Sequence, residues 1–369
     1  MAKRNLLIYG AGAIGRGYLP WVFTPQDYDF YYVEADPGLR GLLQARGAFT
    51  SHMTAAEGYR SQEIAIAGCC APGEEAPWRA QADAMVTAVG PRNFLQLQAA
   101  IRDFAGPVLC CENDARLPAQ MRQLTGHEGV VFAIPDVIVS NTASRDLLAQ
   151  DPLSLITENG ECFIHDRVSP QLPGRGRYVD EQELQHQWLA KLYVHNTPHC
   201  IAAYLGSLRG LAYLHEAMAD ARIAAVVQGA MDEMVAMLRV RSDVRHEFLA
   251  FYRDKELARF RNPWLFDPIA RVAREPFRKL HPQDRLLGAA QRCLAAGVVP
   301  SHLLVGIVAA FCFDRPEDPD AHIRHLRRSM KPRDILQTVF KLQDSEALFM
   351  LLCERWPAIL AQLEGLAHG

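Results

Sequence analysis

The chain has 369 residues, of which 49% are hydrophobic and 22% charged, and its formal net charge is −3. This length and apolar content suffice for two domains of ordinary size. The slightly acidic balance argues against a protein that binds nucleic acid or another polyanion. Nine cysteines without disulfide-framework or zinc-ligand spacing, and apolar runs too short for a signal peptide or a membrane span, favour a cytoplasmic protein that is not associated with membranes.

The chain opens with a short apolar run that leads directly into Gly10-x-Gly12-x-x-Gly15. This order of strand, glycine turn and helix start is typical of a dinucleotide-binding fold, in which the first glycine allows the tight turn, the second lets the backbone approach a pyrophosphate, and the third lets the helix lie close to the strand. A second apolar run ends at Glu34, where a carboxylate would accept hydrogen bonds from the adenosine ribose hydroxyls. Because no arginine is adjacent to Glu34, a 2′-phosphate would be repelled, and we expect NAD rather than NADP.

Through about the first 180 residues, short apolar runs alternate with helical patterns, which predicts a mostly parallel, doubly wound α/β sheet of the Rossmann type. Runs at residues 84–90, 107–111 and 130–134 are the next predicted strands. Residues 153–165 predict an antiparallel hairpin with Asn159-Gly160 as its turn. The carboxyl ends of the parallel strands form the edge where such a sheet binds its ligand. That edge carries Thr87, Gly90, Glu112, Asn113 and Asp136.

From about residue 180 onward almost every window shows helical periodicity. We therefore expect a Rossmann-like dinucleotide-binding domain at residues 1–182. A mostly α-helical domain at residues 183–369 would supply substrate-binding and catalytic groups.

The segment 191–199 places a potential base, an amide and an imidazole within nine residues, at Lys191, Asn196 and His199. On a continuous helix the three side chains would fall within an arc of roughly 140° and could address one cavity. Alternatively, Pro198 favours a helix start, so Thr197 could cap a new helix and leave Asn196 at an irregular break. Either geometry could deprotonate an alcohol and hold the resulting oxygen. The competing interpretation is a lysine and histidines scattered over a helix surface.

Residues 253–292 are rich in arginine and lysine, and prolines interrupt the part between residues 271 and 285. Loops with such side chains are suited to bidentate capture of phosphate, which favours a small phosphorylated substrate. The alternative is that these are surface charges paired with Asp267, Glu275 and Asp284. Aromatic residues do not alternate with the basic ones, so a nucleic-acid interface is not expected.

Lys191-x4-Asn196-x2-His199 resembles the K-x4-N-x2-H signature of the polyol-specific long-chain dehydrogenases, the mannitol dehydrogenase family. Within that family the chain is most similar to the mannitol-1-phosphate 5-dehydrogenase branch. The resemblance extends over nearly the whole chain, with matching motifs at residues 10–17, 87–91, 111–113, 196–206, 259–263 and 271–286.

The resemblance implies an NAD-dependent dehydrogenase, without a metal, that interconverts a sugar-alcohol phosphate and a ketose phosphate. Mannitol 1-phosphate and fructose 6-phosphate are the first pair to consider. Lys191 would take the hydroxyl proton, while Asn196 and His199 would hold the oxygen. Substrate contacts are expected from Asn113, Asp136, Arg274, Arg278 and Lys279, the last three as phosphate ligands. Contacts to NAD(H) are expected from Gly10, Gly12, Ala13, Ile14, Gly15, Arg16, Glu34, Thr87, Val89, Gly90 and Asn113.

The chain departs from the family pattern at a few positions. Val137 follows Asp136 where the family usually has arginine, Trp188 to Ala190 precede the lysine where it tends to carry a glutamate, and Pro198 replaces a small residue. These departures leave open a dehydrogenase for another polyol, a pentitol phosphate or a hexuronate. A hypothesis of a different class is an NAD-binding sensor or regulatory protein without turnover. The helical domain would allow either a monomer or a homodimer.

Overall fold

The structure, a computed structural model, describes residues 2–240, 244–318 and 320–368. The chain forms two compact units. The first comprises Met1–Trp188 and Trp264–Phe266, and the second Leu189–Pro263 and Asp267–Gly369. The expected boundary at residue 182 lies inside helix α8 (Glu181–Leu189), whereas the two units divide near the end of that helix.

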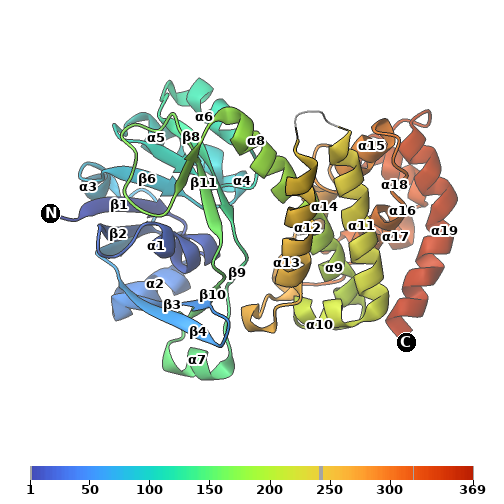
Figure 1. The fold of residues 1–369 in the computed structure, drawn as a ribbon, viewed down its shortest axis with the longest axis horizontal. Helices are drawn as coiled ribbons and strands as arrows, with labels where there is room; N and C mark the ends of the chain where they lie inside the picture. The colour runs from blue at the N-terminus through green and yellow to red at the C-terminus, as the bar shows by residue number, and fades with distance from the viewer. Residues whose placement is uncertain (1, 241–243, 319, 369) are drawn as a thin grey trace. The chain divides into compact units, whose positions relative to one another are not determined.

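The first unit is built on an eight-stranded sheet with the order β12-β11-β8-β7-β6-β1-β2-β5 (Figure 1). From β5 to β8 all neighbouring strands are parallel, and their sequence order is the 3-2-1-4-5-6 order of a Rossmann sheet. The prediction of a doubly wound α/β domain is therefore confirmed. The strands are β1 (Arg4–Tyr9), β2 (Tyr28–Val33), β5 (Gly68–Cys70), β6 (Ala84–Thr87), β7 (Val108–Cys110), β8 (Val130–Asp136), β11 (Glu161–His165) and β12 (Arg177–Val179).

Alternation along β1 explains why this sheet is covered on both faces. Leu6 and Ile8 pack into one apolar cluster, whereas Leu7 and Tyr9 pack into another. Successive side chains of a strand point to opposite faces, so a continuous apolar run buries both. The helical segments of this unit are η1 (Ala13–Tyr18), α1 (Leu19–Val22), α2 (Pro37–Arg46), α3 (Ala76–Arg79), α4 (Pro91–Phe94), η2 (Leu95–Leu97), α5 (Gln98–Arg102), α6 (Leu117–Thr125) and α7 (Arg145–Gln150).

A second, four-stranded sheet has the order β4-β3-β10-β9. The hairpin expected at residues 153–165 is wrong, because β10 pairs with β3 and β9 while β11 pairs with β8 of the large sheet. The turn between β10 and β11 packs closely on the end of β8, where a Cβ on Gly160 would lie 2.4 Å from the Asp136 carbonyl oxygen. The chain thus passes from one sheet to the other. The four strands are β3 (Ala48–Thr54), β4 (Tyr59–Ala65), β9 (Val139–Ser140) and β10 (Leu155–Thr157).

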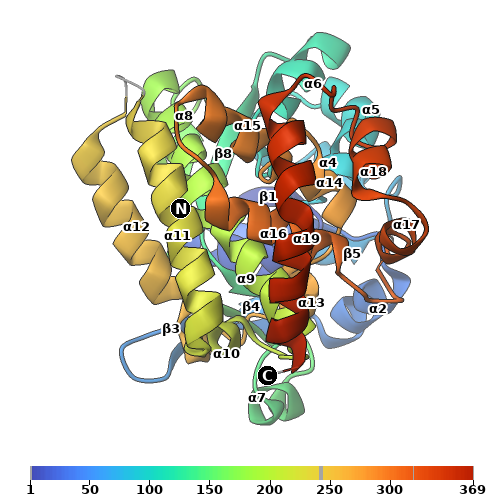
Figure 2. The same cartoon turned by 90° about the vertical axis from the view of Figure 1, so that its right-hand side faces the viewer.

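The second unit is helical, as expected. Helix α9 packs against α11 and α16, and α19 packs on α16 (Figure 2). None of the helices within the described residues is both long and apolar enough to cross a membrane. After α8 come η3 (Ala190–Asn196), α9 (Thr197–Leu208), α10 (Leu214–Ala219), α11 (Ala221–Arg239), α12 (His246–Phe260), η4 (Pro263–Leu265), α13 (Ile269–Val272), α14 (Pro276–Leu280), α15 (Leu287–Ala295), α16 (Ser301–Phe311), α17 (Ile323–Ser329), α18 (Pro332–Thr338) and α19 (Ala347–His368).

Candidate active site

The three glycines after β1 differ in what surrounds them. Gly10 has φ +93°, and a Cβ there would lie 2.5 Å from the Ala88 carbonyl oxygen. A Cβ on Gly15 would lie 2.0 Å from the Gly10 carbonyl oxygen, so helix and strand approach too closely for any side chain. A Cβ on Gly12 would meet nothing within 4 Å. The fold thus requires Gly10 and Gly15, whereas Gly12 leaves open space in which a ligand could approach the backbone.

Arg16 stabilises this turn through hydrogen bonds to backbone carbonyls. Its side chain is buried, and its guanidinium donates from Nε to the Ala11 carbonyl and from Nη1 to the Leu153 carbonyl at 2.8 Å. The guanidinium also lies 5.5 Å from the centre of the Phe49 ring. Arg16 therefore anchors the glycine turn through backbone carbonyls. Two further expected cofactor contacts, Ala13 and Ile14, are half-buried and pack on the same core.

Glu34 lies at the end of β2, beside the glycine turn. Its carboxylate accepts hydrogen bonds from the backbone N–H of Ala11 and of Asp36, each at 2.8 Å. The sequence argument found no arginine next to Glu34, but α2 brings Arg40 back to this point, where it donates to the Glu34 carbonyl at 2.8 Å and to the Ala35 carbonyl at 3.2 Å. The end of β2 therefore carries both a carboxylate and a guanidinium.

The loop after β6 is fixed by a buried carboxylate. Glu112, which follows β7, accepts from the backbone N–H of Val89 at 3.0 Å and of Gly90 at 2.8 Å. Burial raises the pKa of Glu112, although these backbone hydrogen bonds oppose the rise. Thr87 is fully buried at the end of β6, and Gly90 has φ +88°. Glu112 thus orders the loop at the carboxyl edge of the sheet where a dinucleotide is expected.

Lys191 and Asn196 lie on η3, a π-helical segment that continues directly from α8 into α9. The Thr197 backbone N–H bonds to the Leu192 carbonyl, five residues back, and both Asn196 and Thr197 have right-handed helical backbone angles. The alternative of an irregular break at Asn196 is therefore wrong. Pro198 lies in the first turn of α9, directly after the π-helical segment ends. Proline is tolerated there because it has no N–H to donate. Because π bonding links residues five apart, Asn196 lies about one turn from Lys191.

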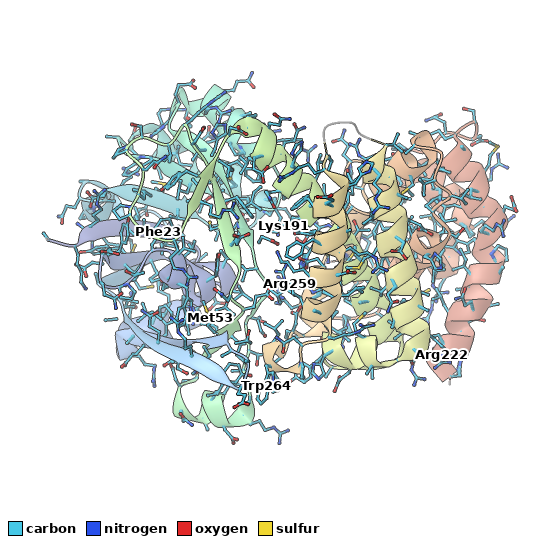
Figure 3. The ribbon with its side chains drawn as sticks, in the orientation of Figure 1. Phe23, Met53, Lys191, Arg222, Arg259 and Trp264 are labelled. Carbon is cyan, nitrogen blue, oxygen red and sulfur yellow. The ribbon has the colours of Figure 1, made fainter. Side chains whose placement is uncertain are left out.

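The amide of Asn196 has an unused donor. Lys191 and Asn196 are each only 7% exposed, and Asn196 Nδ2 has no hydrogen-bond partner among the described residues. A buried N–H without a partner costs about 1–3 kcal/mol. This donor is thus suited to bind an oxygen that the protein itself does not supply. Figure 3 labels Lys191 in the helical unit.

His199 is paired with a buried carboxylate. Its Nε2 lies 2.8 Å from Oδ2 of Asp267, whose other oxygen accepts from Arg271. Burial alone would raise the pKa of Asp267, but Arg271 and His199 outweigh it and lower that pKa to about 2. Asp267 is therefore ionised under ordinary conditions and acts as an acceptor for the imidazole N–H.

A second histidine forms a similar pair on the same helix. His195 Nδ1 bonds to the fully buried carboxylate of Glu256 on α12, which also accepts from Arg259, labelled in Figure 3. The rings of His195 and His199 lie 4.9 Å apart. Phe260 stacks on His199 at 5.0 Å and meets His195 edge-on at 5.4 Å. Two histidine–carboxylate pairs therefore lie beside each other on the segment that carries Lys191 and Asn196.

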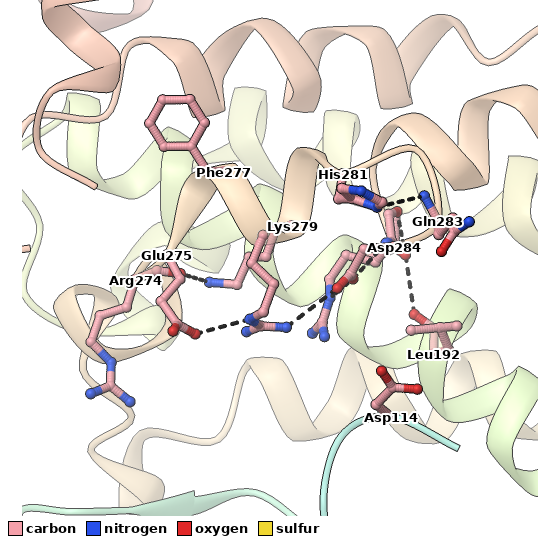
Figure 4. Close-up of polar contacts among 12 residues, drawn as sticks. Asp114, Leu192, Arg274, Glu275, Phe277, Lys279, His281, Gln283 and Asp284 are labelled. Atoms are coloured by element: carbon pink, nitrogen blue, oxygen red, sulfur yellow. Dashed lines mark hydrogen bonds and ion pairs between the residues drawn. The ribbon is translucent and has the colours of Figure 1, made fainter. Parts of the chain in front are cut away.

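The three basic residues that were expected to bind phosphate differ in their exposure and in their partners. Arg274 is exposed, and Arg278 is partly exposed and paired with Glu275 at 2.9 Å. Lys279 is buried, and its ammonium donates to the carbonyls of Val272 and Arg274 (Figure 4). Burial lowers the pKa of Lys279 to about 7. Two of the Lys279 donors are thus directed at the backbone of its own loop, and its role as a phosphate ligand stays a prediction.

Residues 184–348 match the family model described as the mannitol dehydrogenase C-terminal domain. The helical unit therefore contains a domain of the mannitol dehydrogenase C-terminal type.

Solved structures share the fold of this chain at low sequence identity. The ternary complex of Pseudomonas fluorescens mannitol 2-dehydrogenase with NAD and D-mannitol is similar with a TM-score of 0.81 and 16% identity, over 99% of this chain and 94% of that chain. D-sorbitol dehydrogenase in substrate-free form is similar with a TM-score of 0.71 and 14% identity, over 100% of this chain and 95% of that chain. A 2-dehydropantoate 2-reductase from Geobacter metallireducens GS-15 matches with a TM-score of 0.53 and 14% identity, over 83% of this chain and 98% of that chain. These likenesses show the shared fold.

Two residues that depart from the expected family pattern make apolar contacts within the first unit. Val137 is buried in the core, next to Asp136, which is itself 2% exposed at the end of β8. Trp188 packs edge-on against Phe132 with ring centres 5.3 Å apart. Asn113, the remaining expected contact, is exposed at the end of β7. Hydrophobic packing thus accommodates both Val137 and Trp188.

Sequence reasoning missed the roles of three residues in the helical unit. His195 had a usable signal, because it is four residues from both Lys191 and His199, which is the spacing of neighbours on a helix. The carboxylates that hold the two histidines, Glu256 and Asp267, had none, because they are 61 and 68 residues away from them in the chain.

Proposed function

We propose that this chain is an NAD-dependent polyol dehydrogenase that interconverts a sugar-alcohol phosphate and a ketose phosphate, with mannitol 1-phosphate and fructose 6-phosphate as the first pair to test. The observation that supports it best is the combination of a buried amine at Lys191 and a buried donor at Asn196 Nδ2 that has no acceptor among the described residues, about one helical turn apart. A base beside an unused hydrogen-bond donor is suited to an alcohol that loses its proton.

The glycine turn and the loops beside it fit a dinucleotide. NAD would be held by the Gly10 to Gly15 turn, by the Glu34 carboxylate and by the loop that Glu112 orders. The open space at Gly12 is what a pyrophosphate needs in order to approach the backbone. When bound, the nicotinamide supplies the acceptor for the hydride.

The protein's own residues would then handle the proton and the oxygen. Lys191 Nζ takes the proton of the substrate hydroxyl, and Asn196 Nδ2 donates to the same oxygen as negative charge develops on it. To act as a base, Lys191 must be a neutral amine. Burial favours this form over the ammonium. His199, held by Asp267, completes the set of groups around the oxygen.

Two glycine substitutions separate cofactor binding from folding. We expect Gly12→Val to keep the wild-type melting temperature, because nothing lies within 4 Å of the added Cβ, and to weaken NAD binding by about tenfold or more through steric exclusion. Gly15→Ala should instead destabilise the fold by about 1–3 kcal/mol or more, because its Cβ would overlap the Gly10 carbonyl. Thermal unfolding and calorimetric titration with NAD measure both effects. A Gly12→Val variant with wild-type NAD affinity would contradict the assigned cofactor site.

The phosphate part of the proposal depends on Arg274 and Arg278. We expect alanine at either position to raise KM for a phosphorylated substrate by about 10-fold to 100-fold, the effect of losing a charge-assisted hydrogen bond, and to leave KM for the free polyol unchanged. Arg253→Ala is the matched control, since Arg253 lies in the same basic stretch but on α12, away in sequence from Arg274 and Arg278, and pairs with Asp232 and Asp254. Equal activity on free and phosphorylated sugars, unaffected by either change, would favour a free polyol or a hexuronate instead.

A further inference from the structure

The pairing of His199 with Asp267 restricts how the imidazole can act. Asp267 is 3% exposed, and its Oδ2 lies 2.8 Å from Nε2 of His199. Arg271 occupies the other carboxylate oxygen, and Phe260 stacks on the imidazole with an angle of 18° between the ring planes. The ring is therefore held from two sides and cannot exchange its two nitrogens without breaking these contacts.

An ionised carboxylate can only accept, so Nε2 of His199 must carry a hydrogen. Nδ1 is then the nitrogen left for the substrate. In the neutral ring with Nε2–H, Nδ1 is a lone pair and would repel a negatively charged oxygen. In the imidazolium, Nδ1 also carries a hydrogen and can donate to that oxygen.

We propose that Asp267 is a positioning residue that makes His199 hold the substrate oxygen as an imidazolium. The inference rests on the proposed dehydrogenase function and deepens it. Lys191 as a neutral amine takes the hydroxyl proton, while His199 keeps both of its protons and donates Nδ1–H to the oxygen. In the reverse direction the Lys191 ammonium returns the proton, and His199 again only donates.

Charged groups of both signs surround His199. The titratable and charged groups that surround it are Lys191 and His195 on its own helix, Glu256 and Arg259 on α12, Asp267 after η4, and Arg271 on α13.

If Asp267 fixes the Nε2–H form of His199, kcat should fall at alkaline pH, and the Asp267 carboxylate should be the cause of this fall. With the carboxylate in place, deprotonated His199 presents a lone pair to the substrate, so kcat should fall as His199 loses its proton. In Asp267→Asn the amide can turn its N–H toward Nε2, and the neutral ring can then carry its hydrogen on Nδ1 and donate without a charge. The alkaline fall in kcat should therefore disappear in this variant.

The test measures kcat and KM against pH for the wild type, Asp267→Asn and a control. We expect Asp267→Asn to lower kcat at neutral pH by about 10²-fold to 10⁴-fold, the scale known for a carboxylate-to-amide change in a serine-protease His–Asp pair, with KM changed only a few-fold. Glu233→Gln is the control, because Glu233 is a buried carboxylate 2.8 Å from His302 Nδ1 on other helices of the same unit. It should keep the wild-type kcat and pH profile. An Asp267→Asn enzyme that keeps the wild-type alkaline fall would overturn the proposal.

A second measurement separates this inference from the proposed function. Nitrogen chemical shifts of the His199 ring report its tautomer without any turnover. We expect Nε2–H with an unprotonated Nδ1 in the alkaline wild-type protein, and a shift toward Nδ1–H in Asp267→Asn. If no polyol is oxidised but these shifts are found, the dehydrogenase proposal fails while the control of His199 by Asp267 stands. An Nδ1–H tautomer in the alkaline wild type would overturn it.

Discussion

Replacing Lys191 by alanine is expected to lower kcat by about 10³-fold or more while NAD binding is retained. The reason is that Lys191 is the buried amine on η3, whereas the glycine turn that would hold the dinucleotide belongs to the other unit. Steady-state rates and calorimetric titration with NAD, measured on the same preparation, separate the two effects.

Lys331→Ala is the control for this change, because Lys331 is an exposed lysine in the helical unit and should leave both measurements unaltered. Full activity of the Lys191→Ala enzyme would remove the base from the account. If the wild-type protein also bound NAD without oxidising any polyol, the chain would instead be an NAD-binding sensor or regulatory protein.

The second large effect is expected from Glu256→Ala, which should lower the free energy of unfolding by about 3–5 kcal/mol. Glu256 is fully buried, and it accepts from both His195 and Arg259, so its removal takes one counter-charge from a buried guanidinium and one acceptor from a buried imidazole. Urea unfolding of the wild type and the variant measures the difference. The control is Glu247→Ala, a change to an exposed glutamate in the first turn of the same helix. A Glu256→Ala protein as stable as this control would show that the pair contributes little.

The Rossmann domain could be predicted because its signals are local. An apolar run followed by glycines at fixed spacing describes one strand, one turn and one helix start, and each later strand repeats the pattern. The hairpin of β3 and β4 was missed, and the one expected at Asn159-Gly160 was wrong, for a common reason. Strand pairing depends on which edges the folded chain brings together, and short apolar runs do not encode their partners.

Within the candidate site, the sequence could indicate the polar residues of the 191–199 segment. It could not indicate the carboxylates that hydrogen-bond to the histidines. Lys191, Asn196 and His199 lie close in sequence, so helical spacing predicted that they could share a face. Asp267 is 68 residues from His199 and Glu256 is 61 residues from His195, and nothing in the sequence near either histidine indicates them. Composition indicated Lys279 as a phosphate ligand, but it could not indicate that this side chain is buried and donates to carbonyls of its own loop.

The measurement that tests the central claim most directly is NADH oxidation by the purified protein, with fructose 6-phosphate and free fructose as the paired substrates and Lys191→Ala alongside. The account predicts that fructose 6-phosphate causes NADH oxidation, with one polyol phosphate formed for each NADH consumed. Oxidation should be slower with free fructose, and about 10³-fold slower in Lys191→Ala. Binding of NADH without its consumption by any ketose, ketose phosphate or hexuronate would contradict it.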